Sequence, residues 1–139
     1  MIDIGRKAPA FTLKDQTVKT ITASNTLEYT DAGATCNDYV DGVLSHAVEV
    51  SGEVVNMRRP GTYKIRYDCV DLSGKEANPE FCEVKVVDRT CPTVKLNGAA
   101  VNYVEAGFPY TDAGATATDD LDGDITAHIT TSGDTVNTQ

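Results

Sequence analysis

Tryptophan is absent from the sequence, and tyrosine and phenylalanine make up only 6% of its residues. Carbohydrate-binding modules usually hold sugars against exposed aromatic rings, so this composition counts against that class of protein. Basic residues are also few, because 12 Lys and Arg stand against 21 Asp and Glu and leave a net charge of −9. Nucleic-acid phosphates and anionic lipids bind basic surfaces, so we expect neither as a partner.

Long hydrophobic runs are missing as well. No stretch approaches the roughly 18 apolar residues of a membrane span, and residues 1–9 lack the apolar centre of a signal peptide. We therefore expect no membrane insertion, with any signal peptide upstream of this sequence. Four cysteines and abundant threonine are typical of secreted β proteins, which predicts an extracellular or cell-surface location.

Catalytic motifs are not found either. The sequence contains no nucleophile elbow, no phosphate-cradling glycine loop and no zinc-type cysteine spacing. The Ser-Gly and Asp-Gly pairs read as turns. We predict that the chain is not an enzyme.

The most informative feature is a stretch that occurs twice. Residues 29–42 read Tyr-Thr-Asp-Ala-Gly-Ala-Thr-Cys-Asn-Asp-Tyr-Val-Asp-Gly, and residues 110–123 read Tyr-Thr-Asp-Ala-Gly-Ala-Thr-Ala-Thr-Asp-Asp-Leu-Asp-Gly. The same offset then holds without a gap as far as Asn56 and Asn137. Self-similarity at a domain-sized period predicts a tandem array. We assign residues 1–8 to a tail or linker, 9–90 to the first repeat and 91–139 to an incomplete second repeat.

Short apolar and β-branched runs separated by turn residues fill the first repeat. We expect strands at residues 11–13, 18–23, 32–36, 43–50, 54–57, 62–70 and 81–87, and the second repeat begins with a strand at 94–96. In the sixth run Tyr63, Ile65, Tyr67 and Cys69 share one face, which is the pattern of a half-buried strand. About seven strands at this spacing imply an all-β sandwich in each complete repeat.

The two histidines do not occupy equivalent positions in the repeats. The constant offset places the counterpart of His46 at Ala127, one position before His128. A paired metal or catalytic role for the histidines is therefore disfavoured. His46 shares the apolar side of its run with Leu44, Val48 and Val50, so we expect it to be a core or edge residue. His128 has polar neighbours and is expected to be exposed.

Several motifs together resemble a known family. They are the Tyr-Thr-Asp-Ala-Gly-Ala segment, the acidic run at residues 119–126, the Pro60-Gly61-Thr62-Tyr63 segment, and Asp71-Leu72-Ser73-Gly74 ahead of an alternating strand. The chain is similar to hyalin-repeat-like (HYR-like) and bacterial-type immunoglobulin-like domains, which occur in tandem in secreted and surface proteins. The resemblance implies tandem immunoglobulin-like (Ig-like) sandwiches that serve as structural or adhesive units of a surface protein, filament or appendage.

The alternative function is a ligand-binding accessory module of a secreted protein, either for carbohydrate or dependent on calcium. Such a module usually carries exposed aromatic residues on a flat face. An exposed and coplanar set of Tyr39, Tyr103 and Phe108 would favour it.

Four cysteines allow three pairings. If the strands alternate up and down, the runs that end at Cys36 and Cys69 finish at the same end of the sandwich with both side chains inward, which favours a disulfide between them. Cys69 with Cys82 across the last hairpin is the alternative. Cys91 lies at the junction of the repeats and is free to bond to a neighbouring subunit.

Four carboxylates, Asp119, Asp120, Asp122 and Asp124, crowd one loop of the second repeat. Calcium prefers several carboxylate and carbonyl oxygens from a flexible turn, so this loop is a candidate calcium site. The alternative is a turn in which Asp side chains accept hydrogen bonds from nearby backbone amides. The first repeat retains only Asp38 and Asp41 at the equivalent positions, close to Asp68 and Asp71.

The second repeat stops before any counterpart of the two final strands of the first. Its apolar residues would then lack partners and its strands would have an open edge: Val101, Val104, Phe108, Ala115, Ile125 and Ile129. We expect neighbouring copies or further repeats of the same protein to complete it by strand addition, which predicts a homo-oligomer or filament.

Overall fold

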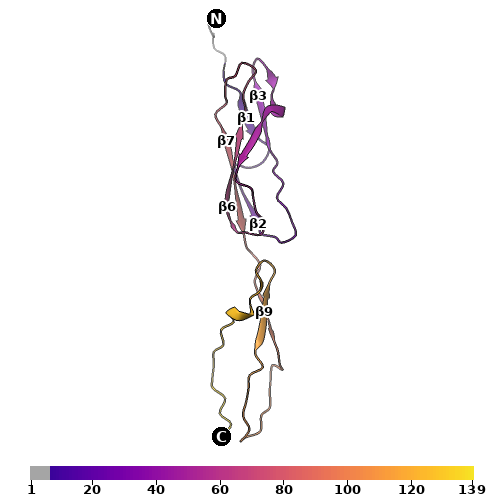
Figure 1. The fold of residues 1–139 in the computed structure, drawn as a ribbon, viewed down its shortest axis with the longest axis vertical. Coiled ribbons are helices and arrows are strands. Elements are labelled where there is room, and N and C mark those ends of the chain that lie inside the picture. The colour runs from indigo at the N-terminus through magenta and orange to yellow at the C-terminus, as the bar shows by residue number, and fades with distance from the viewer. Residues whose placement is uncertain (1–6) are drawn as a thin grey trace. The chain divides into compact units, whose positions relative to one another are not determined.

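The computed structural model describes residues 7–139, so most of the predicted tail at 1–8 lies outside the described residues. The chain divides into two compact units, Met1–Asp88 and Arg89–Gln139, and the division falls two residues before the boundary expected from the sequence (Figure 1). Within the described residues, each unit is all-β apart from a single short 3₁₀ turn.

The first unit consists of seven strands in two sheets. The strands are β1 (Ala10–Leu13), β2 (Val18–Thr22), β3 (Ala34–Asp38), β4 (Gly42–Val43), β5 (Glu49–Gly52), β6 (Gly61–Asp68) and β7 (Glu80–Val87). One sheet has the order β1-β3-β4 and the other the order β2-β7-β6-β5. All neighbours are antiparallel except β2, which runs parallel to β7. The predicted Ig-like sandwich is confirmed in this unit.

The core of this sandwich comes mainly from the alternation of β6 and β7. Ile65 and Tyr67 of β6 are buried, as are Cys82, Val84 and Val86 of β7, while the residues between them face outward or lie partly exposed. Successive side chains of a strand point to opposite faces, so one face of this hairpin is apolar. Residues of the opposite sheet and of the flanking segments pack against it: Phe11, Leu13, Ile21, Tyr29, Ala34, Val55 and Met57.

The run at residues 43–50 is not one strand, so this prediction is wrong. It divides into β4, a 3₁₀ turn (η1, Ser45–Ala47) and β5. The chain crosses here from one sheet to the other, because β4 pairs with β3 and β5 pairs with β6. Leu44 is buried at the crossing, but His46 is exposed in the turn, and its predicted place on an apolar strand face is wrong as well.

The run at residues 54–57 is not a strand either. Val55 and Met57 are buried as alternation predicts, yet no strand pairs with them. The backbone is held instead by a 2.8 Å bond from the Ser24 amide to the Met57 carbonyl, and Asn56 Oδ1 accepts the Arg58 amide at 2.9 Å. Apolar alternation therefore marks burial here without a strand ladder.

The second unit has three strands, β8 (Thr93–Leu96), β9 (Ala115–Asp119) and β10 (Gly123–Asp124), followed by a 3₁₀ turn (η2, Thr126–His128). The elements β9, β10 and η2 repeat β3, β4 and η1 residue for residue, at the offset that the sequence repeat sets. The sheet order β10-β9-β8 likewise repeats the order of β4, β3 and β1. The two stretches that are alike in sequence thus form the same local structure.

The first strand of each unit follows a slightly different offset. Leu13 lies opposite Ala34 in the first unit, and Leu96 lies opposite Ala115 in the second, so the offset from β1 to β8 is larger by two than the offset from β3 to β9. At this larger offset residues 101–105 are the counterpart of β2, with Val104 in the place of Ile21. The difference of two therefore arises in the loop between 105 and 110.

Only one of the two sheets exists in the second unit, which the structure describes in full. Its residues 101–105 and 130–133, the counterparts of β2 and β5, form no strand. In the first unit these strands pair with β7 and β6, and the 139-residue sequence holds no counterpart of β6 or β7. Figure 1 draws both segments as plain traces without arrows.

Candidate functional site

Three carboxylates meet where β3 and β6 end. Asp38 is the last residue of β3, Asp41 lies in the turn before β4, and Asp71 follows β6. Each offers a carboxylate oxygen within 4.8 Å of the other two, and Asp38 and Asp71 are buried. We call this the Asp38–Asp41–Asp71 cluster. The sequence placed Asp68 near it too, but Asp68 binds Arg66 in a two-pronged ion pair at 2.8 Å.

The hydrogen bonds of the cluster show what its carboxylates do locally. Asp38 Oδ1 accepts the amides of Val40 and Asp41 at 2.8 and 2.9 Å, which closes the β3–β4 turn. Asp41 Oδ2 accepts the Leu72 amide at 3.0 Å and so connects the two loops.

Asp71 braces its own loop in the same manner. Its Oδ1 accepts the amides of Ser73 and Lys75, both at 2.8 Å, and the Ser73 hydroxyl at 2.6 Å. Buried carboxylates are stable when backbone amides donate to them, because those donors replace lost water. The cluster therefore orders two turns, with its oxygens turned toward one another.

The second unit repeats the first half of this arrangement. Asp119 Oδ1 accepts the amides of Leu121 and Asp122 at 2.8 and 3.0 Å, as Asp38 does for its own turn. Oxygens of Asp119 and Asp122 lie within 4.8 Å of each other. Of the four carboxylates expected to share a calcium site, the structure brings these two together.

The other two predicted ligands lie differently. Asp120 is exposed on the turn. Asp124 lies on β10, where its Oδ1 accepts the Thr126 amide at 2.9 Å, and hydrogen bonding by Thr126 lowers the pKa of this carboxyl. Asp124 thus accepts the amide of the first residue of η2.

A disulfide joins Cys36 of β3 to Cys69, which follows β6, with 6.7 Å between the Cα atoms. Both cysteines are buried beside Leu44 and Ala77, so the bond connects the two sheets next to the acidic cluster. Cys82 is a buried free thiol in the main core, and burial raises its pKa. Cys91 is free and exposed.

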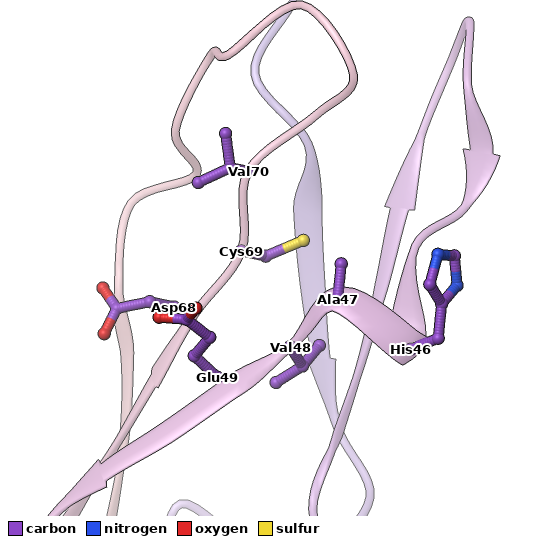
Figure 2. A pocket seen from close by; sticks show the side chains of 7 residues that line it. All are labelled: His46, Ala47, Val48, Glu49, Asp68, Cys69 and Val70. Atoms are coloured by element: carbon purple, nitrogen blue, oxygen red, sulfur yellow. The ribbon is translucent and has the colours of Figure 1, made fainter.

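An open depression of about 360 Å³ lies beside the disulfide, lined by His46, Ala47, Val48, Glu49, Asp68, Cys69 and Val70. Figure 2 shows the imidazole of His46 on one side of it and the carboxylates of Glu49 and Asp68 on the other. A histidine acts as a general base or metal ligand only within hydrogen-bond or coordination reach of its partner. Among the described residues, no group of three or more His, Cys, Asp or Glu side chains that could hold a metal ion includes His46.

Exposed aromatic residues are present in both units. Tyr39 is 96% exposed on the β3–β4 turn, and in the second unit Tyr103 is 97% and Phe108 is 59% exposed. The sequence analysis named exposure of these three residues in one plane as the sign of a binding surface. All three are exposed, Tyr39 in the first unit and the other two in the second.

The comparisons with known proteins agree with this architecture. The sequence profile of the family described as "Bacterial surface protein, Ig-like domain" matches residues 11–80 and 94–139, most of the chain. The chain belongs to this family. The Ig-like part of the resemblance seen in the sequence is thereby confirmed, and kinship with hyalin repeats stays a prediction. None of the curated proteins matches the chain.

Two solved structures resemble this Ig-like chain. A lipoprotein from Bacteroides thetaiotaomicron is 16% identical, with a TM-score of 0.49 over 60% of this chain and 39% of its own. A structure of CBM51-2 in complex with GlcNAc and INT domains from Clostridium perfringens ZmpB is 16% identical, with a TM-score of 0.46 over 70% of this chain and 22% of its own. The chain thus spans well under half of either protein.

Membership of this family makes the chain a module of a bacterial surface protein. Within residues 7–139, no helix has the length and apolar character needed to span a membrane.

Proposed function

We propose that the chain is a non-catalytic structural or adhesive segment of an extracellular bacterial surface protein, in which Ig-like units follow one another as repeats. The observation that carries this proposal is the recurrence of β3, β4 and η1 as β9, β10 and η2 at one constant offset along the chain. Repeated units of one design suit a spacer, because length is added by copying a stable module.

The chemistry of the first unit supports the same role. Its buried carboxylates accept backbone amides, and its disulfide fastens one sheet to the other. These contacts use polar groups to hold loops in place. A module that bears load or spans distance outside the cell needs this kind of reinforcement, because a small domain buries little apolar surface and is only marginally stable without it.

Single-molecule stretching of the chain between two handles tests the structural role. We expect a distinct unfolding event for the first unit, and reduction of the disulfide releases the 33-residue separation between Cys36 and Cys69 as extra length. At about 3.5 Å per residue, that gain is roughly 110 Å. A Cys36→Ser/Cys69→Ser chain is the matched control, since it gives the longer extension with or without reductant. Unfolding at forces near the noise level would contradict a load-bearing role.

The second candidate function is a ligand-binding accessory module. The exposure of Tyr39 and Tyr103 favours it, because an exposed ring can stack on a sugar. A glycan array probed with and without calcium separates the two functions. The structural role predicts no saturable binding, whereas a binding module predicts saturable binding that Tyr39→Ala or Tyr103→Ala removes.

A further inference from the structure

The sheet of the second unit has an apolar side that solvent reaches. Val94 and Leu96 of β8 are 61% and 56% exposed, and Val136 is 54% exposed. Their counterparts in the first unit, Phe11, Leu13 and Val55, pack against or belong to the main core. We call Val94, Leu96, Ala115 and Val136 the open face.

The first unit shows what lies over this surface when it is covered. The β6–β7 hairpin presents Tyr63, Ile65 and Tyr67 from one strand and Cys82, Val84 and Val86 from the other, and these side chains pack with Phe11, Leu13 and Ala34. In the second unit Ala115 takes the place of Ala34, opposite Leu96 in the same register. The open face therefore matches, in residue type and register, the surface that the apolar β6–β7 hairpin covers in the first unit.

Two further segments of the second unit point to the same occupant. Residues 101–105 and 130–133 correspond to β2 and β5, which in the first unit pair with β7 and β6 along the outer edges of the hairpin. In the second unit Val101 is 68% and Val104 is 39% exposed. A hairpin placed between these segments would supply hydrogen-bond partners to the backbone N–H and C=O groups of both.

A glycine in the second unit supplies separate support. Gly52 in β5 has φ +94°, and a Cβ there would come within 2.5 Å of the Lys64 carbonyl in β6. Its counterpart Gly133 has φ +124° with nothing within 4 Å. The second unit thus carries a glycine at the position where crowding arises only when a β6-like strand is beside it.

We propose that the open face is the docking surface for a further β-hairpin of the β6–β7 kind. Its first strand pairs antiparallel with residues 130–133, and its second strand pairs parallel with residues 101–105. Apolar side chains at alternate positions of the hairpin cover Val94, Leu96 and Val136.

A hairpin attached to the same chain is favoured over one donated by a second copy. In the first unit Tyr67, Val84 and Val86 are at most 2% exposed, so a copy could lend its β6–β7 hairpin only by opening its own core. An attached hairpin also arrives at the high effective concentration of an intramolecular contact.

The test uses the full chain with its own hairpin grafted after Gln139. Gln139 is the counterpart of Arg58, so residues 59–88 are appended, with Ala in place of the graft's copy of Cys69 because Ala117 stands where the first unit has Cys36. We expect amide exchange at residues 101–105 and 130–133 to slow by about tenfold or more relative to the ungrafted chain. The control graft carries Asp at its copies of Ile65 and Val84 and should give no slowing.

Gly133→Ala provides a second readout. The positive φ of Gly133 strains an alanine, but in the ungrafted chain residues 130–133 form no strand whose pairing could be lost, so we expect exchange there to stay unchanged. In the grafted chain we expect the substitution to remove most of the protection at residues 130–133. A protected 101–105 segment in the ungrafted monomer would overturn the proposal, as would a graft that slows no exchange. Protection that rises with concentration as the ungrafted chain associates would overturn attachment in favour of a second copy.

Discussion

The hydroxyl of Tyr67 donates a 2.7 Å hydrogen bond to Oδ1 of Asp31. Tyr67 lies in β6 and is 1% exposed, whereas Asp31 belongs to the partly exposed segment that leads into β3. The bond therefore connects the core strand of one sheet to the segment that enters the other. Together with the disulfide between Cys36 and Cys69, it gives the two sheets two specific attachments besides apolar packing.

Tyr67→Phe should lower the free energy of unfolding of the first unit by about 1–2 kcal/mol, because it removes a buried hydrogen bond to a charged acceptor. The ring and its packing stay in place, so the fold should be unchanged. Urea unfolding measures the difference. Tyr39→Phe is the matched control, since Tyr39 is 96% exposed, and it should be neutral. Equal stability of the two variants would contradict a role for the Asp31 contact.

The same tyrosine predicts a loss of stability in alkali. Burial, followed by the contact with Asp31, raises the pKa of the Tyr67 hydroxyl above its usual value. Above about pH 10 the unfolded chain loses this proton while the folded chain keeps it, so stability falls as pH rises, by up to about 1.4 kcal/mol per pH unit. Tyr67→Phe should show a shallower decline above pH 10 and a parallel profile below pH 9. Identical slopes in both chains would rule the effect out.

The disulfide should contribute about 3–4 kcal/mol, as loop-closure entropy predicts for the 33-residue separation of Cys36 and Cys69. Cys36→Ala with Cys69→Ala should therefore lower the urea midpoint of the first unit strongly. Cys91→Ser is the control, since Cys91 is exposed, and it should have no effect. Peptide mapping without reductant checks the pairing, and a Cys69–Cys82 peptide would show the alternative connection.

Gly52→Ala should destabilise the first unit much more than Gly42→Ala. Both glycines have positive φ, at +94° and +76°, so each substitution places a side chain in the left-handed region at a cost of about 1 kcal/mol. Only at Gly52 does the added Cβ also meet backbone, 2.5 Å from the Lys64 carbonyl. The difference between the two melting temperatures therefore measures the crowding of β5 against β6. Equal decreases in melting temperature would mean that β5 moves away from β6 at no cost to make room for the added Cβ.

Much of the first unit could be predicted because β6 and β7 alternate over their whole length. Period-2 patterning fixes which side chains face inward, and it predicted the inward face of the sixth run, where Ile65 and Tyr67 are buried. The same alternation, together with the expected up-and-down order of the strands, favoured Cys36 with Cys69 over Cys69 with Cys82, and Cys36–Cys69 is the disulfide present in the structure.

The crossing at residues 43–50 could not be predicted in this manner. Leu44, Val48 and Val50 alternate like a strand, but the Ser45 hydroxyl accepts the Cys36 amide at 3.2 Å and the chain turns there. The acidic cluster depends even more on tertiary structure, because Asp71 reaches Asp38 only through the ends of two strands in different sheets. Sequence reasoning placed both Asp68 and Asp71 near Asp38 and Asp41, but it could not show that only Asp71 joins them while Asp68 binds Arg66.

Substitutions in the acidic turn of the second unit can distinguish two roles of Asp119: accepting hydrogen bonds from the turn amides, or binding a metal ion. Asp119→Asn keeps the oxygen that accepts the Leu121 and Asp122 amides but removes the charge, so for bracing alone we expect amide exchange in the turn close to that of the unchanged chain. Asp119→Ala removes the acceptor and should speed exchange at both amides by about tenfold, equivalent to about 1.4 kcal/mol of local stability.

The calcium hypothesis adds a further expectation at the same turn. Millimolar calcium should slow exchange at Leu121 and Asp122 and raise the melting temperature, because a ligand that binds only the folded state stabilises it. Asp119→Asn combined with Asp122→Asn should remove this response without altering the turn in chelator, since both substitutions take away only negative charge. The equivalent pair in the first unit, Asp38→Asn with Asp41→Asn, tests whether the Asp38–Asp41–Asp71 cluster responds on its own. If exchange and melting are the same in calcium and in chelator, Asp38, Asp41 and Asp119 keep only the role of accepting turn amides.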